Sequence, residues 1–523
     1  MKFLGQRISR LKYFLSCDLP SVKYKMYLRR HKPITNFGQR IILVESDQSS
    51  GNVLGLSLFL PVLTKHLTSR AVHFSMMKKD LNKSFKQHLR NYFSINRILG
   101  LRDTILIADD NPRLSEYSLV MKKITTAEEL EEFSIDGVRI GDLVYDTFLR
   151  RTSRPTVEID SKEFQAIFSE CVSYFLNLQD LFRRKEISAV CISHCVYHFA
   201  IPARLALSFG IPVFQVTSES IYRLNRDKTH AYTEFTHYRE TFSHLSETER
   251  TKARNLAKVR LDQRFSGQVA VDMPYSTKSA FSDEGVTKEF KFPDDGKKRI
   301  LIATHDFFDS PHSYGDNLYP DFYIWLKRLG ELSNETDYNW YLKTHRDSVA
   351  DDKPIFAELV RKFPKFNEID ANISHHKIIQ AGMDVVLTVF GTVGMEYPAL
   401  GIPVINASRN NPHVNYDFSV TPKNITEYES LIRNLSSYSF QINKSEIYEY
   451  YYMAHLFNPK SWIYYDYDLF LEDIGGYEKS VSNQVFTEFL RNSPNRRPLF
   501  EINSALDKFL VSGDFRLARQ HFE

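Results

Sequence analysis

The feature that most constrains the fold is a phrase that occurs twice in the chain. It reads SFGIPVFQV at residues 208–216 and ALGIPVINA at residues 399–407. Each copy follows an apolar run, 187–192 and 385–387, and a segment of helical length that ends at the glycine. Strand, helix, glycine and strand form a βαβ unit. The two copies predict an α/β chain with two Rossmann-like domains that face each other across a cleft.

The second copy carries a glycine turn that favours a ligand. Gly391-Thr392-Val393-Gly394 separates the strand from a short helix, and glycine lets the backbone approach a bound molecule closely. The free N–H groups and the dipole of the helix start favour a phosphate, and Glu396 is one turn further on, within reach of a sugar hydroxyl. Pro398 limits the site to the first turn. The sequence therefore predicts a nucleotide-sugar site; the alternative is a packed turn without a ligand.

Polar side chains follow the other predicted strands, where ligands bind in this class of fold. Candidate catalytic residues are His194, Asp47, Glu45 and Asp306. Glu45 and Asp47 could otherwise cap the helix or stay solvated, and His194 could otherwise be a helix-capping or hydrogen-bonded histidine. Histidine is included because its pKa lies near working pH. Candidate donor-binding and phosphate-binding groups are Gly391, Thr392, Val393, Gly394, Glu396, Lys343, His345 and His305. We find no metal-ligand pattern and expect no cofactor.

Three local patterns predict structural roles. The acids and arginines of residues 138–151 are expected to form ion pairs that hold a helix over the cleft; the alternative is a catalytic role. A Thr or Ser followed three residues later by Glu predicts a capping box. This pattern starts at Thr126 with Glu129, and again at Thr426 with Glu429.

The chain of 523 residues is long enough for two or three domains. Turn formers and mixed charges mark a linker between the two halves, and the end of the chain has helical periodicity. The predicted division is a basic N-terminal segment (1–35), a first Rossmann-like domain that holds the acceptor (36–275), a linker (276–297), a second Rossmann-like domain that holds the donor (298–445) and a helical C-terminal tail (446–523).

The net charge and the cysteine content indicate which classes of partner and which cellular compartment suit the protein. The net charge is only +4 and no basic stripe interleaves with aromatics, so we expect no nucleic-acid partner. Four cysteines without zinc or disulfide spacing favour a cytoplasmic protein. The first 32 residues carry nine Lys or Arg and one acid. Two interpretations stay open: peripheral contact with the inner face of the cytoplasmic membrane, or a solvated helix packed on the fold.

The second half contains two blocks found together in a known class of enzymes. Lys343-Thr344-His345 and the stretch from Gly391 to Glu396, followed by Gly401-x-Pro403-Val404, resemble the GT-B glycosyltransferases of bacterial capsule and surface-polysaccharide assembly, including the Kdo-transferase-like capsule proteins. Arg346 stands where those proteins usually have proline. The resemblance covers residues 298–420; the first half agrees only in its order of strands and helices.

The resemblance implies a GT-B-like fold and a metal-independent transferase. A nucleotide-sugar donor would bind the second domain, and a glycan or lipid-linked glycan acceptor would bind the first. An alternative is a polyol-phosphate transferase of the teichoic-acid type, which would use a CDP-linked donor and a histidine pair such as His345 and His413 as acid and base. A third reading is a non-catalytic polysaccharide-assembly protein.

Overall fold

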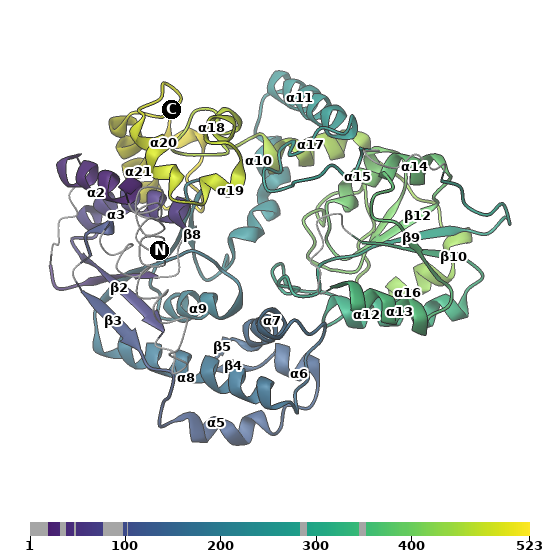
Figure 1. Cartoon of the computed structure of the whole chain (residues 1–523), viewed down its shortest axis with the longest axis horizontal. Helices are drawn as coiled ribbons and strands as arrows, with labels where there is room; N and C mark the ends of the chain where they lie inside the picture. Colours follow the sequence, from purple (N-terminus) through teal and green to yellow (C-terminus); the bar gives the residue numbers. More distant parts are fainter. Residues whose placement is uncertain are drawn as a thin grey trace, which may run out of the picture.

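The computed structural model describes residues 19–31, 38–45, 49–76, 98–101, 103–282, 290–344 and 352–523. The predictions for Asp47, His345 and most of the basic N-terminal segment lie outside these ranges. In the described part of the chain, no helix is long and apolar enough to cross a membrane. Figure 1 shows two α/β units, joined by helices and loops.

The first unit is built on a six-stranded sheet in the order β3-β2-β1-β6-β7-β8. Five strands are parallel, and β8 runs antiparallel to β7 at one edge. The strands are β1 (Ile41–Glu45), β2 (Arg70–Met76), β3 (Thr104–Ile107), β6 (Ile187–Ile192), β7 (Val213–Val216) and β8 (Ile221–Leu224). The first half of the chain therefore forms the predicted Rossmann-like sheet, with one added edge strand.

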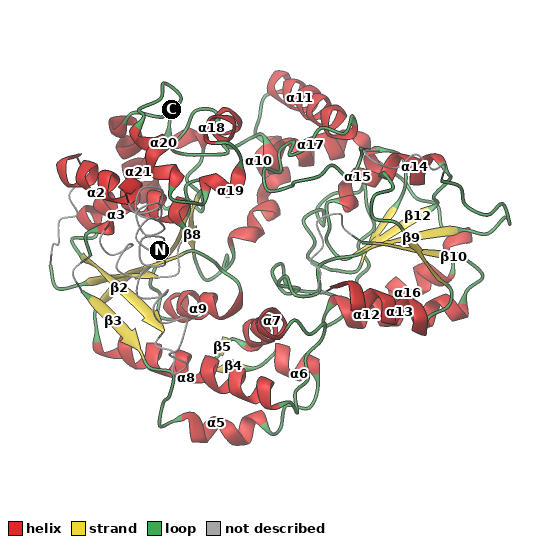
Figure 2. Cartoon of the chain, viewed as in Figure 1, coloured by secondary structure: helices red, strands yellow, loops and turns green. Residues whose placement is uncertain are grey.

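Strand β1 explains why helices cover both faces of this sheet (Figure 2). Its five residues are all buried, and side chains alternate along a strand. Ile41 and Leu43 belong to one hydrophobic cluster, whereas Ile42 and Val44 belong to another on the opposite face. The covering helices of this unit are α3 (Ser50–His66) on one face and α7 (Gly141–Thr152), α8 (Lys162–Arg184) and α9 (Ile201–Ser208) on the other.

The second unit has a five-stranded, fully parallel sheet in the order β11-β10-β9-β12-β13. Ile300 and Ile302 face one cluster, and Leu301 faces the other. The strands are β9 (Arg299–Ala303), β10 (Asn339–Lys343), β11 (Phe366–Ile369), β12 (Val385–Thr388) and β13 (Val404–Asn406). The helices are α12 (Phe322–Glu335), α13 (Asp352–Lys362), α14 (His375–Gln380), α15 (Val393–Ala399) and α16 (Ile425–Arg433). The predicted GT-B-like pair of parallel α/β units is present.

The end of the chain is helical, as predicted, and it completes the core of the first unit. Phe486, Phe489, Leu506 and Phe509 share a cluster with Ile42 of β1. In Figure 1 the C-terminal helices, drawn yellow, lie beside the purple α2 and α3. These helices are α18 (Tyr467–Ile474), α19 (Tyr477–Ser480), α20 (Gln484–Leu490) and α21 (Leu499–Ser512).

A third layer links the two units through α10 (Tyr238–Ser243), α11 (Glu247–Phe265) and α17 (Lys444–His455). Their apolar faces form one cluster that also includes Met395 of α15 and Tyr416. Helix α11 therefore packs against elements of the second unit, although it precedes the predicted linker. The residue boundaries proposed for the domains stay predictions.

The capping predictions have two outcomes. Thr126 and Glu129 form the expected capping box at the start of α6 (Ala127–Glu131). The prediction for Thr426 is wrong, because α16 begins at Ile425 and its cap is Asn424, whose side chain accepts from the Glu427 amide at 2.9 Å. Asn424 has the extended backbone of an N-cap residue, so the helix starts there and Thr426 lies within its first turn. The remaining elements are α2 (Leu19–His31), α5 (Leu114–Met121), α6 (Ala127–Glu131), β4 (Ser134–Ile135), β5 (Val138–Arg139) and the 3₁₀ turns Tyr197–Ala200, Ala231–His237, Leu435–Ser437 and Arg519–His521.

Candidate functional site

The glycine turn lies where β12 ends, at the carboxyl edge of the second sheet. The Gly394 amide donates to the Gly391 carbonyl at 2.9 Å, and the Glu396 amide donates to the Thr392 carbonyl at 3.0 Å. The amides of Gly391, Thr392 and Val393 donate no hydrogen bond to any residue that the structure describes. Three consecutive N–H groups are thus open to an acceptor such as a phosphate oxygen.

His305 lies directly beside this turn, as the sequence predicts for a residue at a neighbouring strand end. Its Nε2 accepts from the Val389 amide at 3.2 Å, and its ring stacks on Phe322 with centroids 4.5 Å apart. Because Nε2 is the acceptor, the geometry assigns the proton of the neutral ring to Nδ1. A Cβ atom built on Gly391 would lie 3.4 Å from His305 Cε1. Whether His305 binds a donor stays a prediction.

Glu396 has a partner that the sequence did not indicate. Arg264 of α11 donates through Nε to Glu396 Oε1 at 2.7 Å, and its Nη2 lies 2.6 Å from the same oxygen. The Glu396 side chain is 2% exposed and that of Arg264 is 13% exposed. Within the described chain, Glu396 Oε2 accepts no hydrogen bond. Arg264 therefore fixes one carboxylate oxygen and leaves the other available, so the predicted contact with a sugar hydroxyl is compatible with the pair.

Gly394 is required by packing. A Cβ atom there would lie 2.6 Å from Cε1 of His413, closer than side chains tolerate. His413 is 2% exposed, and burial lowers its pKa to about 3, so the imidazole is neutral. Glycine at position 394 thus lets the backbone pack closely against the buried His413. No signal near Gly394 in the sequence identifies that neighbour.

The other candidates of the second unit are engaged with the backbone. Lys343 is 4% exposed and its Nζ donates to the Ala371 carbonyl at 2.8 Å. Asp306 accepts from the Phe308 amide at 2.9 Å. Next to Lys343, a cavity of about 550 Å³ opens where β10 and β11 end, with Thr344 and Asp370 in its wall. Its size is in the range of small-molecule sites.

In the first unit, Glu45 ties two strand ends together. Its Oε2 accepts from the Ser193 amide at 2.8 Å and from the Ser193 hydroxyl at 2.7 Å, and the side chain is 5% exposed. His194 follows Ser193 and is exposed. The structure thus brings Glu45 and His194 to one edge of the sheet, and their catalytic roles stay predictions. Among the described residues, no group of three or more His, Cys, Asp or Glu is placed to hold a metal ion.

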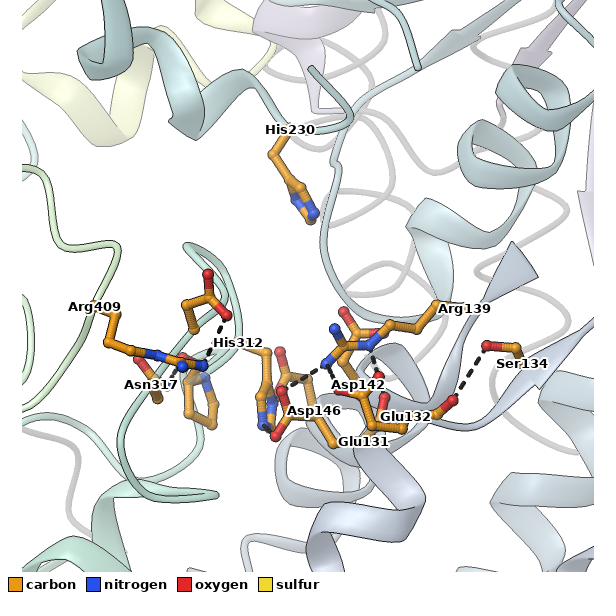
Figure 3. A network of polar contacts seen from close by, with 12 residues as sticks. Glu131, Glu132, Ser134, Arg139, Asp142, Asp146, His230, His312, Asn317 and Arg409 are labelled. Atoms are coloured by element: carbon orange, nitrogen blue, oxygen red, sulfur yellow. Dashed lines mark hydrogen bonds and ion pairs between the residues drawn. The ribbon is translucent and has the colours of Figure 1, made fainter. Parts of the chain in front are cut away.

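The loop after β9 reaches across to the first unit and contacts α7, the helix of the ion-pair block (Figure 3). His312 Nδ1 lies 2.6 Å from Asp146 Oδ1, and both side chains are buried. One residue earlier on α7, the Tyr145 hydroxyl donates to Asp321 at 2.5 Å. The acids and arginines of this block do form ion pairs, as predicted, and those of Arg139, Asp142 and Arg151 lie within the first unit. Asp146 is the member of the block that pairs with the second unit, through His312. Sequence reasoning missed His312 as a partner.

Burial and the neighbouring carboxylates shift the pKa of His312 in opposite directions. Burial lowers the pKa of His312, but Asp146, Glu131 and Asp142 outweigh it and raise the pKa to about 9. His312 is therefore a cation at neutral pH. Burial raises the pKa of the neighbouring Asp142, but nearby positive charges, above all Arg204, lower it more. The pKa of that carboxyl falls to about 2. Burial raises the pKa of Asp146 in spite of the adjacent His312, so the contact between the units is a buried hydrogen-bonded pair whose positive member is His312.

Comparisons with known proteins give no family. No protein-family model and no curated protein matches the sequence. Among solved structures, the UDP-GlcNAc 2-epimerase of Neisseria meningitidis bound to UDP-GlcNAc aligns over 87% of this chain and 100% of its own, at 11% identity and a TM-score of 0.22. A glycosyltransferase from Rickettsia africae aligns over the same shares at 11% identity and a TM-score of 0.24. Anabaena HepE in complex with UDP and glucose aligns over 87% of this chain and 100% of its own, at 11% identity and a TM-score of 0.21. The fold assignment rests on the sheet orders above.

Proposed function

We propose that the protein is a glycosyltransferase that uses a nucleotide-activated sugar. The observation that carries the proposal is the turn from Gly391 to Val393, whose three amides are open at the carboxyl edge of a parallel sheet. His305 adds a ring beside the turn, and Glu396 adds a carboxylate oxygen that Arg264 holds in place. Amides suit the diphosphate of the donor, and a carboxylate suits a hydroxyl of its sugar or ribose.

The chemistry that this arrangement supports is departure of a nucleoside diphosphate. Negative charge develops on the leaving oxygen as the sugar is transferred, and fixed N–H donors stabilise it without reorganisation. The acceptor would approach from the first unit, where Glu45 and His194 lie at one sheet edge. A base in that position would take the proton from the attacking hydroxyl.

The narrower assignment to capsule or surface-glycan assembly is supported by the sequence blocks at Lys343 and Gly391 alone. The alternative transfer of a polyol phosphate would use a histidine pair such as His345 and His413 as acid and base, and the structure describes His413 of that pair. His413 is buried, and its pKa of about 3 makes it a poor match to a working pH near neutrality. This observation favours glycosyl transfer over phosphoryl transfer.

The test removes one amide and keeps the backbone. Thr392 has φ −59°, close to the value that proline imposes, and its side chain makes no capping bond. Thr392→Pro therefore deletes one open N–H, and Thr392→Ala is the matched control that retains it. In a thermal-shift screen with UDP, GDP, CDP and CMP, we expect one nucleotide to raise the melting temperature of the wild type.

Loss of a hydrogen bond to a charged group costs about 1.5–3 kcal/mol, so Thr392→Pro should weaken binding about 10- to 100-fold. Thr392→Ala should bind as the wild type does. Equal affinity of the two variants, each shown to be folded by its melting temperature, would exclude the turn as the phosphate site. No shift with any of the four nucleotides would reject the proposed function.

A further inference from the structure

A second cavity, of about 350 Å³, lies between the two units and away from the glycine turn. The first unit supplies Arg139, Arg204 and Arg226 to its wall, and the loop after β9 supplies His312 and Gly315. Figure 3 shows His230 pointing from its loop toward the group around His312, Asp142 and Arg139. The cavity is large enough for a monosaccharide, and it shares His312 and Asp142 with the contact between the units.

Two of the arginines in this wall are already matched by carboxylates. Arg204 makes a bidentate contact with Asp142, at 2.5 and 2.6 Å, and Arg139 Nη2 lies 2.6 Å from Glu131. His230 adds no charge, because burial, with a smaller contribution from Arg204, lowers its pKa to about 4. The acids of the wall are therefore occupied by Arg204 and Arg139.

Arg226 and the Nε2 atom of His312 are not matched in this way. Arg226 donates only to the carbonyls of Leu207 and Ser208, at 3.1 and 3.0 Å, and no carboxylate of the described chain lies within 4.0 Å of it. His312 is 4% exposed, and its Nδ1 is paired with Asp146. Its Nε2 has no hydrogen-bond partner among the residues that the structure describes, and the nearest carboxylate oxygen there, on Glu131, is 3.7 Å away. A buried N–H donor without an acceptor is costly, which indicates that an acceptor arrives from outside.

We propose that this cavity binds an acidic sugar, either a uronate or a sugar phosphate, whose anionic group lies between the Arg226 guanidinium and the His312 imidazolium. Arginine recognises carboxylate and phosphate through two parallel donors, and His312 adds a desolvated donor on the wall. The proposal rests on the proposed function in one respect: the acidic sugar would be part of the acceptor glycan. Binding at the cavity itself requires no nucleotide.

The charge of His312 predicts how binding depends on pH. The charged groups that face it are Asp146 and Asp142 of α7, Glu131 of α6 and Asp321 before α12. With these neighbours the pKa of His312 is raised to about 9, so the cation persists through neutrality. Affinity for an acidic sugar should hold from pH 6 to 8 and fall as the pH rises through 9.

The experiment is calorimetric titration of the full chain, without nucleotide, with glucuronate, glucose 6-phosphate and glucose. We expect one or both acids to bind and glucose to bind at least tenfold more weakly; the acid that binds more tightly identifies the anionic group. Arg226→Gln should weaken that binding about tenfold. Arg409→Gln is the matched control, because Arg409 is a half-exposed arginine paired with Asp316 and is absent from the cavity wall.

Two results would overturn the inference. Glucose could bind as tightly as the acids, or Arg226→Gln could bind as Arg409→Gln does. His312→Gln provides a second route, since it should remove the loss of affinity at high pH. Thr392→Pro should leave acid binding unchanged, so a failure at this cavity and a failure of the nucleotide site are told apart by the same set of proteins.

Discussion

The Arg264–Glu396 pair allows a prediction of defined size. Glu396 is 2% exposed, and apart from it Arg264 has only one long contact in the described chain, from Nη1 to the Val271 carbonyl at 3.4 Å. Glu396→Ala would leave a guanidinium that is 13% exposed without its carboxylate. Breaking a buried pair in this way costs about 3–5 kcal/mol, because the remaining charge is neither solvated nor neutralised.

A double-mutant cycle measures the coupling energy between Arg264 and Glu396. Glu396→Ala and Arg264→Ala should each lower the free energy of unfolding by about 3–5 kcal/mol. The double variant has no isolated charge, so its loss should be close to that of one single variant. The coupling energy between the two residues is then about as large as one single loss, about 3–5 kcal/mol. As a control, the pair Arg519–Glu523 has the same 2.7 Å distance but is about 60% exposed, and its coupling should stay below about 1 kcal/mol.

The assay is urea unfolding of the four proteins, followed by circular dichroism, with nucleotide affinity measured alongside. A double variant whose loss equals the sum of the single losses within about 0.5 kcal/mol would refute the buried ion pair. Nucleotide binding separates the two roles of Glu396. Arg264→Ala should weaken binding even where the protein is folded, because the carboxylate is no longer held in place.

Three further outcomes are expected. Gly394→Ala forces a Cβ to within 2.6 Å of His413 and should destabilise the protein by about 1–3 kcal/mol in thermal unfolding, with partial recovery when His413→Ala is added. The pKa of His312 is raised to about 9, so its contribution to stability, about 3 kcal/mol, is complete below pH 6.5 and is lost as the pH rises through 9. The gap in stability between wild type and His312→Gln should shrink accordingly, and a constant gap would contradict the positive charge on His312. Tyr145→Phe removes the donor to buried Asp321 and should cost about 1–3 kcal/mol; an unchanged melting temperature would show that this bond contributes nothing.

The sequence was sufficient for the framework of the site because the relevant signals are local. The apolar run 385–387, the glycine turn and the strand at Val404 follow one another closely, and each is recognisable within a short window. The position of His305 beside Gly391 followed from one rule, that neighbouring parallel strands end at the same edge. These features needed no knowledge of distant residues.

What the sequence could not predict depends on pairs that are far apart along the chain. Arg264 and Glu396 are separated by 132 residues, and His312 and Asp146 by 166, so no local pattern joins them. Strand β8 was missed because it is only four residues long and half of it is not fully buried, which leaves no clear apolar run. The prediction of the cap at α16 failed because the sequence offers two good cap residues, Asn424 and Thr426, only two positions apart.

The return of the last helices to the first sheet has a consequence for biosynthesis. Twelve residues of α3 are buried, and part of that cover comes from α20 and α21, which are made only when the chain is nearly finished. At about 5–20 residues per second, the ribosome needs roughly 20–90 s to pass from one segment to the other. The second unit, encoded later, can close its own core first. The first unit must wait with an apolar helix uncovered, which makes the nascent chain a natural client for chaperones.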